Sequence, residues 1–298
     1  MVDEPTHFSQ SATGDLAGET LADILAEVQD GAIAPRLELP LLAASGLVKN
    51  FGGTCCAVDR ARIEVPQGSI TGLVGPNGAG KTTLFNLLSN AIRPDQGRVL
   101  FDGEPIHHLQ PHIIAQMGIV RTFQVARVLS RLSVLDNLLL AAQKQTGERF
   151  WNTWFRQKQI AHEENAQRQK AFEILESIGL AHMASDYAGA LSGGQRKLLE
   201  MGRALMAEPK LILLDEPTAG VNPTLINQIC DRIRGWNRDG MTFLIIEHNM
   251  DVIMSLCDRV WVLAEGRNLA DGTPAEIQSN PEVFAAYLGQ YAESGSVS

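Results

Sequence analysis

Cysteine is scarce in this sequence, and the cysteines that are present show no metal-binding spacing. There are four among 298 residues: Cys55, Cys56, Cys230 and Cys257. Cys55 and Cys56 are adjacent, which suits neither a zinc site nor an easily formed disulfide. A chain of this length can bury a core large enough to fold without cross-links. We therefore expect four reduced cysteines, mostly packed in the interior of a protein from a reducing compartment.

An excess of basic residues and long apolar runs are also missing. Acidic residues outnumber basic ones, 34 to 25, and the formal net charge is −9. This balance argues against a general affinity for nucleic acid or anionic lipid, so we expect no nucleic-acid partner. No stretch is apolar for long enough to cross a bilayer, and residues 1–5 lack the basic flank and apolar run of a signal peptide. We expect any membrane role to come through a partner.

What is present is the composition of a folded protein. Hydrophobic residues make up 45% and charged residues 20%, in a chain long enough for one large domain or a core with a subdomain. Residues 1–40 are polar and acidic, with a short amphipathic stretch at 16–28. They favour a flexible N-terminal extension with a transient helix, and a dedicated docking segment is the alternative. We place the folded domain at residues 41–290 and a tail at 291–298.

Apolar patterning predicts a series of strands joined by helices. Strands are expected at residues 61–65, 70–74, 99–101, 211–214, 243–246 and 260–263. Asp102 and Gly103 predict a hairpin turn. A helix is expected after residue 80, and residues 135–190 are largely helical in pattern. The alternation indicates an α/β protein with a mainly parallel sheet covered on both faces, and a helical subdomain inserted at about residues 125–207.

A glycine-rich loop after the strand at 70–74 fits the phosphate-loop pattern G-x-x-x-x-G-K-[ST]. Its glycines let backbone amides turn toward phosphate oxygens, and the helix that follows points its positive end at the same anion. Lys81 would reach the β- and γ-phosphates, and the Thr82 hydroxyl would ligate Mg²⁺. An ordinary glycine-rich surface turn is the alternative. The candidate nucleotide-binding residues are Gly75, Pro76, Asn77, Gly78, Ala79, Gly80, Lys81, Thr82 and Thr83.

Two carboxylates follow the apolar strand at 211–214. They are Asp215 and Glu216. In a sheet of this type, the carboxyl end of a buried strand lies beside the phosphate loop. Asp215 can then hold the hydration shell of Mg²⁺, and Glu216 is a candidate general base for the attacking water. With the loop, these residues predict a phosphate-loop NTPase, whether kinase-like, GTPase or motor.

A second candidate anion site precedes the acidic strand. Its residues are Leu191, Ser192, Gly193, Gly194 and Gln195. Ser192 can cap a helix that runs through residue 205, and the glycines leave the first amides of that helix bare. A subunit needs only one phosphate loop, so a second subunit would complete the site; an ordinary capped helix is the alternative. LSGGQ is the signature of ATP-binding cassette (ABC) proteins, which this chain resembles over about residues 41–288.

The resemblance implies a fold and roles for further residues. The fold is an ABC cassette with an antiparallel β subdomain beside the core sheet. Gln124 matches the glutamine that senses Mg²⁺ or the attacking water, and His248 matches the histidine that contacts the γ-phosphate. Phe51 stands where the family has an aromatic stacked on adenine, although it could equally be a core residue. Asn222 replaces the aspartate usual in the dimer-contacting loop; it can still form hydrogen bonds but brings no charge.

Three segments resemble those of one particular group within the ABC family. Residues 121–124 (RTFQ), a polar insertion at 143–169 and a tail at 270–289 look like those of ATPases from branched-chain or neutral amino-acid importers, such as the cyanobacterial type. The insertion's aromatics either pack the subdomain core or form a partner-contact patch; they are Phe150, Trp151, Trp154 and Phe155. Urea importers are close relatives, so an ATPase of a urea or amide importer is one alternative. A soluble ABC ATPase without a transport role is the other.

For such an ATPase the resemblance implies ATP and Mg²⁺ as cofactors and a location at the cytoplasmic face of the plasma membrane. The implied partners are transmembrane permease subunits, a second ABC ATPase of the same or a related kind and, indirectly, a periplasmic solute-binding protein. Two subunits would clamp ATP between them, and closing would orient Glu216, water and His248. The groove that receives the permease is expected near Gln124, between the core and the helical subdomain.

Overall fold

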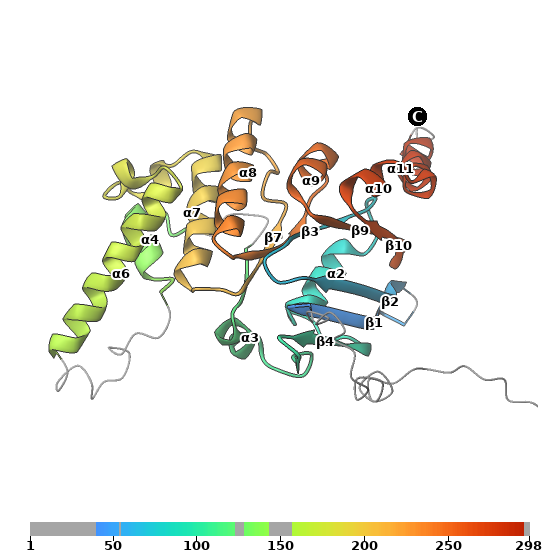
Figure 1. The fold of residues 1–298 in the computed structure, drawn as a ribbon, viewed down its shortest axis with the longest axis horizontal. Helices are drawn as coiled ribbons and strands as arrows, with labels where there is room; N and C mark the ends of the chain where they lie inside the picture. The colour runs from blue at the N-terminus through green and yellow to red at the C-terminus, as the bar shows by residue number, and fades with distance from the viewer. Residues whose placement is uncertain (1–39, 54, 123–127, 143–156, 295–298) are drawn as a thin grey trace, which may run out of the picture. The chain divides into compact units, whose positions relative to one another are not determined.

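A six-stranded sheet forms the centre of the computed structural model, which describes residues 40–53, 55–122, 128–142 and 157–294 (Figure 1). The strand order is β10-β9-β3-β8-β7-β6. Neighbouring strands are parallel except for β10, which pairs antiparallel with β9. The strands are β3 (Ile70–Val74), β6 (Ile119–Arg121), β7 (Leu211–Asp215), β8 (Thr242–Ile246), β9 (Arg259–Ala264) and β10 (Arg267–Gly272). The prediction of a mainly parallel α/β sheet is confirmed.

Helices cover both faces of this sheet, so its central strands are buried throughout. Every residue of β3, β7 and β8 is buried, and successive side chains point to opposite faces. Phe243 and Ile245 belong to one apolar core with α7, α8 and α9, whereas Leu244 and Ile246 belong to a second core with α2. Figure 1 shows these helices on opposite sides of the strands. They are α2 (Lys81–Leu88), α7 (Gly193–Met206), α8 (Pro223–Arg238) and α9 (Met250–Leu256).

A second, antiparallel sheet shares the core of α2. Its order is β2-β1-β4-β5, with bounds β1 (Leu42–Phe51), β2 (Cys55–Val65), β4 (Gln96–Phe101) and β5 (Glu104–Pro105). The predicted hairpin turn at Asp102 and Gly103 joins β4 to β5. The apolar pattern does not predict β1 as a strand, because register shifts between Ala44 and Asn50 break its alternation.

Among the described residues, every named element between β6 and β7 is a helix. They are α4 (Val134–Leu139), α6 (Gln157–Ser177), the 3₁₀ helices η3 (Ala181–Met183) and η4 (Ala188–Ala190), and α7. Helices α4, α6 and α7 pack on one another. Just before β6, α3 (Pro111–Met117) ends at Gly118, which has a φ of 110°. The helical pattern predicted for residues 135–190 is confirmed where the structure describes them, at 135–142 and 157–190, whereas the bounds of the inserted subdomain stay a prediction.

The described part of the chain ends in α10 (Pro274–Gln278) and α11 (Pro281–Ser294). Thr273 and Glu276 form a reciprocal cap at the start of α10. None of the described helices is both long and apolar enough to span a membrane. The predicted extension up to residue 39, Gln124, the four aromatics of the insertion and residues 295–298 lie outside the described residues.

Candidate functional site

The loop of residues 75–80 connects the buried strand β3 to the first turn of α2. Gly75 and Gly80 have φ angles of 152° and 92°. A Cβ atom at Gly75 would lie 2.0 Å from the carbonyl oxygen of Leu263, and one at Gly80 would lie 2.3 Å from that of Ala57. Both ends of the loop lie directly against the backbone of neighbouring strands, so only glycine fits at these two positions.

Lys81 is the first residue of α2, and its ammonium group lies within the loop. Nζ donates hydrogen bonds to the backbone oxygens of Gly75 and Pro76, at 2.7 and 2.8 Å. The residue is only 5% exposed. Burial lowers the pKa of Lys81, and the negative charge of Glu216 opposes that shift. The cation is therefore held at the helix start, where an anion bound by the loop would meet it.

A cavity of about 460 Å³ opens over the loop. It is lined by residues 77–83 together with Cys55, Cys56, His248 and Glu265, among others. The four cysteines are free, as predicted, but only Cys230 and Cys257 are buried. Cys55 and Cys56 are exposed because β2 begins at the wall of the cavity rather than in the core. The expectation of mostly packed cysteines is thus wrong for this pair.

Phe51 lies beside the same wall. It ends β1 and is paired in register with Cys55. The residue is 46% exposed, and Nζ of Lys49 lies 5.9 Å from the centre of its ring. The core alternative for Phe51 is therefore wrong, and an exposed ring is what stacking on adenine requires. The stacking itself stays a prediction.

The carboxyl ends of β7 and β8 bring the two candidate catalytic residues into contact. Glu216 follows β7, and its Oε1 lies 2.6 Å from Nε2 of His248, which follows β8. The two strands are parallel neighbours, so residues far apart in sequence meet at one edge of the sheet. Glu216 also has a φ of 49°, an uncommon value for a residue with a side chain. The fold holds this carboxylate in a defined position.

Two residues that the sequence analysis misses hold this pair in place. Glu247 is 3% exposed, and its Oε1 accepts hydrogen bonds from N and Oγ1 of Thr218 at 2.7 and 2.6 Å. Its Oε2 accepts a bond from N of His248 at 3.2 Å. Lys197 of α7 donates to the backbone oxygen of Glu216 at 2.7 Å, and burial lowers its pKa. A carboxylate directly after the apolar strand at 243–246 is the signal that could have found Glu247.

Asp215 is the last residue of β7 and is 8% exposed. Its Oδ2 accepts a hydrogen bond from Nη2 of Arg121 at 2.9 Å. Thr82 is the second residue of α2. The carboxylate of Asp215 and the hydroxyl of Thr82 are oxygen donors, and Mg²⁺ is usually bound by one or two such protein groups together with waters and substrate phosphates. Gln124, the third predicted metal residue, lies outside the described range.

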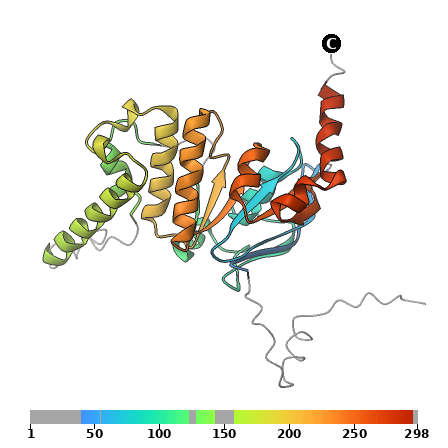
Figure 2. The same cartoon turned by 45° about the horizontal axis from the view of Figure 1, so that its top comes forward.

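The signature segment begins α7 with a reciprocal cap. Oγ of Ser192 accepts a hydrogen bond from N of Gln195 at 3.3 Å, and Oε1 of Gln195 accepts one from N of Ser192 at 2.9 Å. A Cβ atom at Gly193 would meet nothing, but one at Gly194 would lie 1.7 Å from Cδ2 of Leu225 in α8. The prediction of an open helix start is therefore confirmed only at Gly193, because Gly194 lets α7 and α8 lie side by side (Figure 2).

The signature segment and the phosphate loop do not share a cavity within this chain. None of residues 191–195, all of which the structure describes, lines the cavity over the loop. Leu191 is buried in the core that α7 shares with α8. Asn222 caps α8, because its Oδ1 accepts a hydrogen bond from N of Leu225 at 2.9 Å. A dimer contact by Asn222 stays a prediction.

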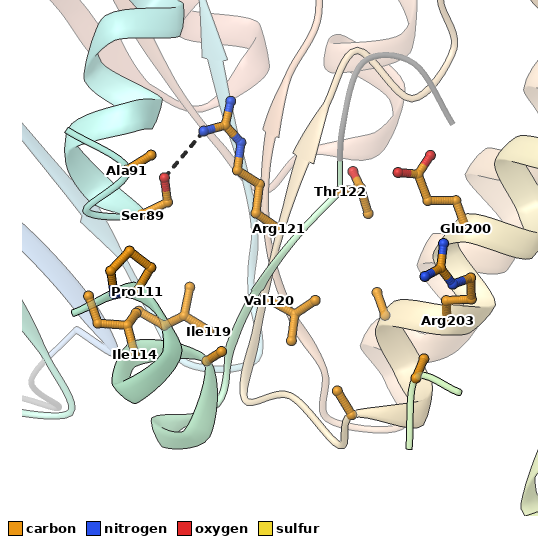
Figure 3. A pocket seen from close by; sticks show the side chains of 14 residues that line it. Ser89, Ala91, Pro111, Ile114, Ile119, Val120, Arg121, Thr122, Glu200 and Arg203 are labelled. Atoms are coloured by element: carbon orange, nitrogen blue, oxygen red, sulfur yellow. Dashed lines mark hydrogen bonds between the residues drawn. The ribbon is translucent and has the colours of Figure 1, made fainter. Parts of the chain in front are cut away.

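A second cavity, of about 510 Å³, lies between α3 and β6 on one side and α7 on the other (Figure 3). Most of its lining residues are small or apolar, and its charged ones are Arg121, Glu200 and Arg203. Val120 and Thr122 also line it, so it lies directly before residues 123–127, which are outside the described range. We call this cavity the β6 groove. The predicted groove near Gln124 stays a prediction, because Gln124 lies outside the described residues.

The last helix reaches the phosphate loop. Tyr287 of α11 packs against the core that contains Val74 and Val283. Burial raises the pKa of Tyr287, and the backbone amide of Gly75 opposes that shift. The phenol hydroxyl therefore lies near the first residue of the loop, so the C-terminal segment contributes to the surroundings of the site.

Two protein families match stretches of this chain. The ABC transporter family matches residues 58–219, and the branched-chain amino acid ATP-binding cassette transporter family matches residues 267–293. A probable branched-chain amino acid transport ATP-binding protein, LivG of Archaeoglobus fulgidus, is 42% identical over 255 residues, 84% of this chain and 96% of that protein. BraF of Pseudomonas aeruginosa, a high-affinity branched-chain amino acid transport ATP-binding protein, is 38% identical over 252 residues, 84% and 98% of the two chains. The crystal structure of an ADP conformation of an ABC transporter cassette has a TM-score of 0.73 and 40% identity, covering 84% of this chain and 99% of that one.

Proposed function

This chain belongs to the ABC transporter family, and we propose that it is the ATP-hydrolysing subunit of an importer for branched-chain or other neutral amino acids. The observation that carries the ATPase part is the 2.6 Å contact between Glu216 and His248, at the edge of the sheet where the phosphate loop lies. The solute class rests on the relatives named for branched-chain amino acids and on the matching segment at 267–293.

Each residue of the site has its own role in ATP hydrolysis. The loop amides and Lys81 bind the phosphates, and Glu216 takes a proton from the attacking water. His248 contacts the γ-phosphate, and Phe51 stacks on adenine. Thr82, Asp215 and Gln124 would hold Mg²⁺, which would supply positive charge to offset the negative charge that develops during phosphoryl transfer.

Two subunits are needed for a complete site. The residues of one half are 75–83 and those of the other are 191–195, and within this chain they do not line the same cavity. The capped start of α7, with Gly193 open, supports a contact with the nucleotide of a facing subunit. The partner is a second copy of this chain or a related ATPase.

We assign the β6 groove to a short cytoplasmic helix of a permease subunit. The groove is mainly apolar and lies directly before residues 123–127, which include Gln124. An apolar groove suits the apolar face of an amphipathic helix, and its three charged side chains would set the orientation of that helix. The ATPase would then sit at the cytoplasmic face of the membrane, and a periplasmic solute-binding protein would act on it only through the permease.

Turnover with and without the permease tests this function. We expect the purified chain to hydrolyse ATP slowly and to be stimulated by about fivefold or more when its permease subunits are added, the size of a typical coupling between two sites. Ala115→Glu places a carboxylate in the groove from α3, so it is expected to keep basal turnover and lose stimulation. Ala275→Glu on α10, away from the groove, is the matched control. Equal turnover with and without permease would favour a soluble ABC ATPase instead.

A further inference from the structure

Arg121 is the last residue of β6, and its guanidinium joins two elements of the nucleotide site. Nη2 donates to Oδ2 of Asp215 at 2.9 Å, at the end of β7. Nη1 donates to Oδ1 of Asn86 at 2.6 Å and to Oγ of Ser89 at 3.3 Å, both in or just after α2. The guanidinium carbon also lies 4.9 Å from the centre of the Phe85 ring. Arg121 therefore connects the helix that starts at the phosphate loop to the strand that carries the metal-site carboxylate.

The same side chain belongs to the β6 groove. Figure 3 shows Arg121 beside Ser89, and the groove is also lined by Val120 of β6 and by Thr122, which follows the strand. The side chains of Arg121 and Asp215 are only 17% and 10% exposed, so water screens their interaction weakly. A charge-assisted bond of this kind depends strongly on geometry. A partner that binds in the groove and shifts β6 would therefore change the hydrogen bond between Arg121 and Asp215.

We propose that Arg121 is a positioning residue that orients Asp215 for Mg²⁺ and couples that orientation to occupation of the β6 groove. The coupling part rests on the proposed function. A carboxylate with one oxygen held by a charged donor presents its other oxygen in a fixed direction. Partners behind a metal-binding group tune metal affinity without touching the metal. Because one guanidinium contacts both α2 and β7, a helix docked in the groove can alter the metal site without reaching it.

The simpler explanation is that Arg121 only neutralises a buried carboxylate. The two explanations differ in what Arg121→Lys does. Lysine keeps the positive charge but lacks the planar fork that reaches Asp215 and Asn86 together. A purely neutralising role would survive this change, or would lose thermal stability without any change in the response to Mg²⁺.

The test measures Mg²⁺ dependence of nucleotide binding and stimulation by permease. A fluorescent ATP analogue is titrated in EDTA and at rising Mg²⁺ concentrations. For Arg121→Lys we expect unchanged affinity for the ATP analogue in EDTA. We expect the Mg²⁺ concentration that produces half of the change in this affinity to rise by about 10- to 100-fold. Stimulation of turnover is expected to fall while the permease still co-purifies. Arg267→Lys, which alters an exposed pair with Asp59, is the matched control and is expected to behave like wild type.

Each outcome decides one part of the proposal. Wild-type Mg²⁺ dependence in Arg121→Lys would overturn the positioning role, even if the variant melts at a lower temperature. A shifted Mg²⁺ dependence with full permease stimulation would overturn the coupling alone. If the wild-type chain is not stimulated by permease, the proposed function and the coupling fail together, and the binding titration still decides whether Arg121 positions Asp215.

Discussion

Glu216→Gln is expected to lower ATP turnover by about 10²- to 10⁴-fold, the usual contribution of a positioned general base. The amide has nearly the shape of the carboxylate but cannot accept the proton of the attacking water. Nucleotide binding does not need that proton transfer, so the variant is expected to bind ATP and accumulate as an ATP-bound dimer. Turnover assays combined with sizing in ATP and Mg²⁺ measure both effects.

Glu265→Gln is the matched control for this variant. Glu265 lines the cavity over the phosphate loop and has the same φ as Glu216, 49°. It follows β9 rather than β7, and its replacement is expected to leave turnover close to wild type. Retained turnover in Glu216→Gln would show that another group is the base. A dead variant that never dimerises would show that an unlike partner ATPase completes the site.

Lys81→Ala is expected to weaken ATP binding by at least about 30-fold, because removing one partner of a buried, hydrogen-bonded charge pair costs about 2–5 kcal/mol. The ammonium group donates to the backbone oxygens of Gly75 and Pro76, and the Pro76 oxygen also accepts a hydrogen bond from N of Ala79. Its loss removes both the cation at the helix start and two contacts that shape the loop.

Nucleotide titration and thermal melting separate these effects. Lys210→Ala removes another lysine, which pairs with Asp102 on the surface, and is expected to bind ATP like wild type. Lys81→Ala is expected to melt near the wild-type temperature without nucleotide and to gain no stability when ATP is added. Wild-type affinity in Lys81→Ala would contradict the assignment of this loop.

The sequence predicts the parts of the fold that are formed by residues close together in the chain. Strands β3, β7 and β8 are buried on both faces, so they are continuous apolar runs that are easy to recognise. The phosphate loop and the capped start of α7 are defined by residues close in sequence. Ser192 caps α7 as predicted, and the structure shows that Gln195 completes a reciprocal cap with it.

What could not be predicted depends on contacts between distant residues. β6 has only three residues, too few for a periodic signal, yet it carries Arg121 to Asp215 across 94 positions of sequence. The contact of Glu247 with Thr218 likewise exists only because β7 and β8 are neighbours. Gly194 looks like a flexible residue in the sequence, and only the approach of α8 shows that it is a packing position.

Transport itself is the most direct test of the central claim. The chain is purified with its permease subunits and partner ATPase, reconstituted in vesicles with the solute-binding protein, and assayed for uptake of labelled leucine and of labelled urea. We predict leucine uptake that requires ATP on the side of this chain and disappears with Glu216→Gln. Uptake of urea but not leucine, or leucine uptake that continues with Glu216→Gln, would contradict the account.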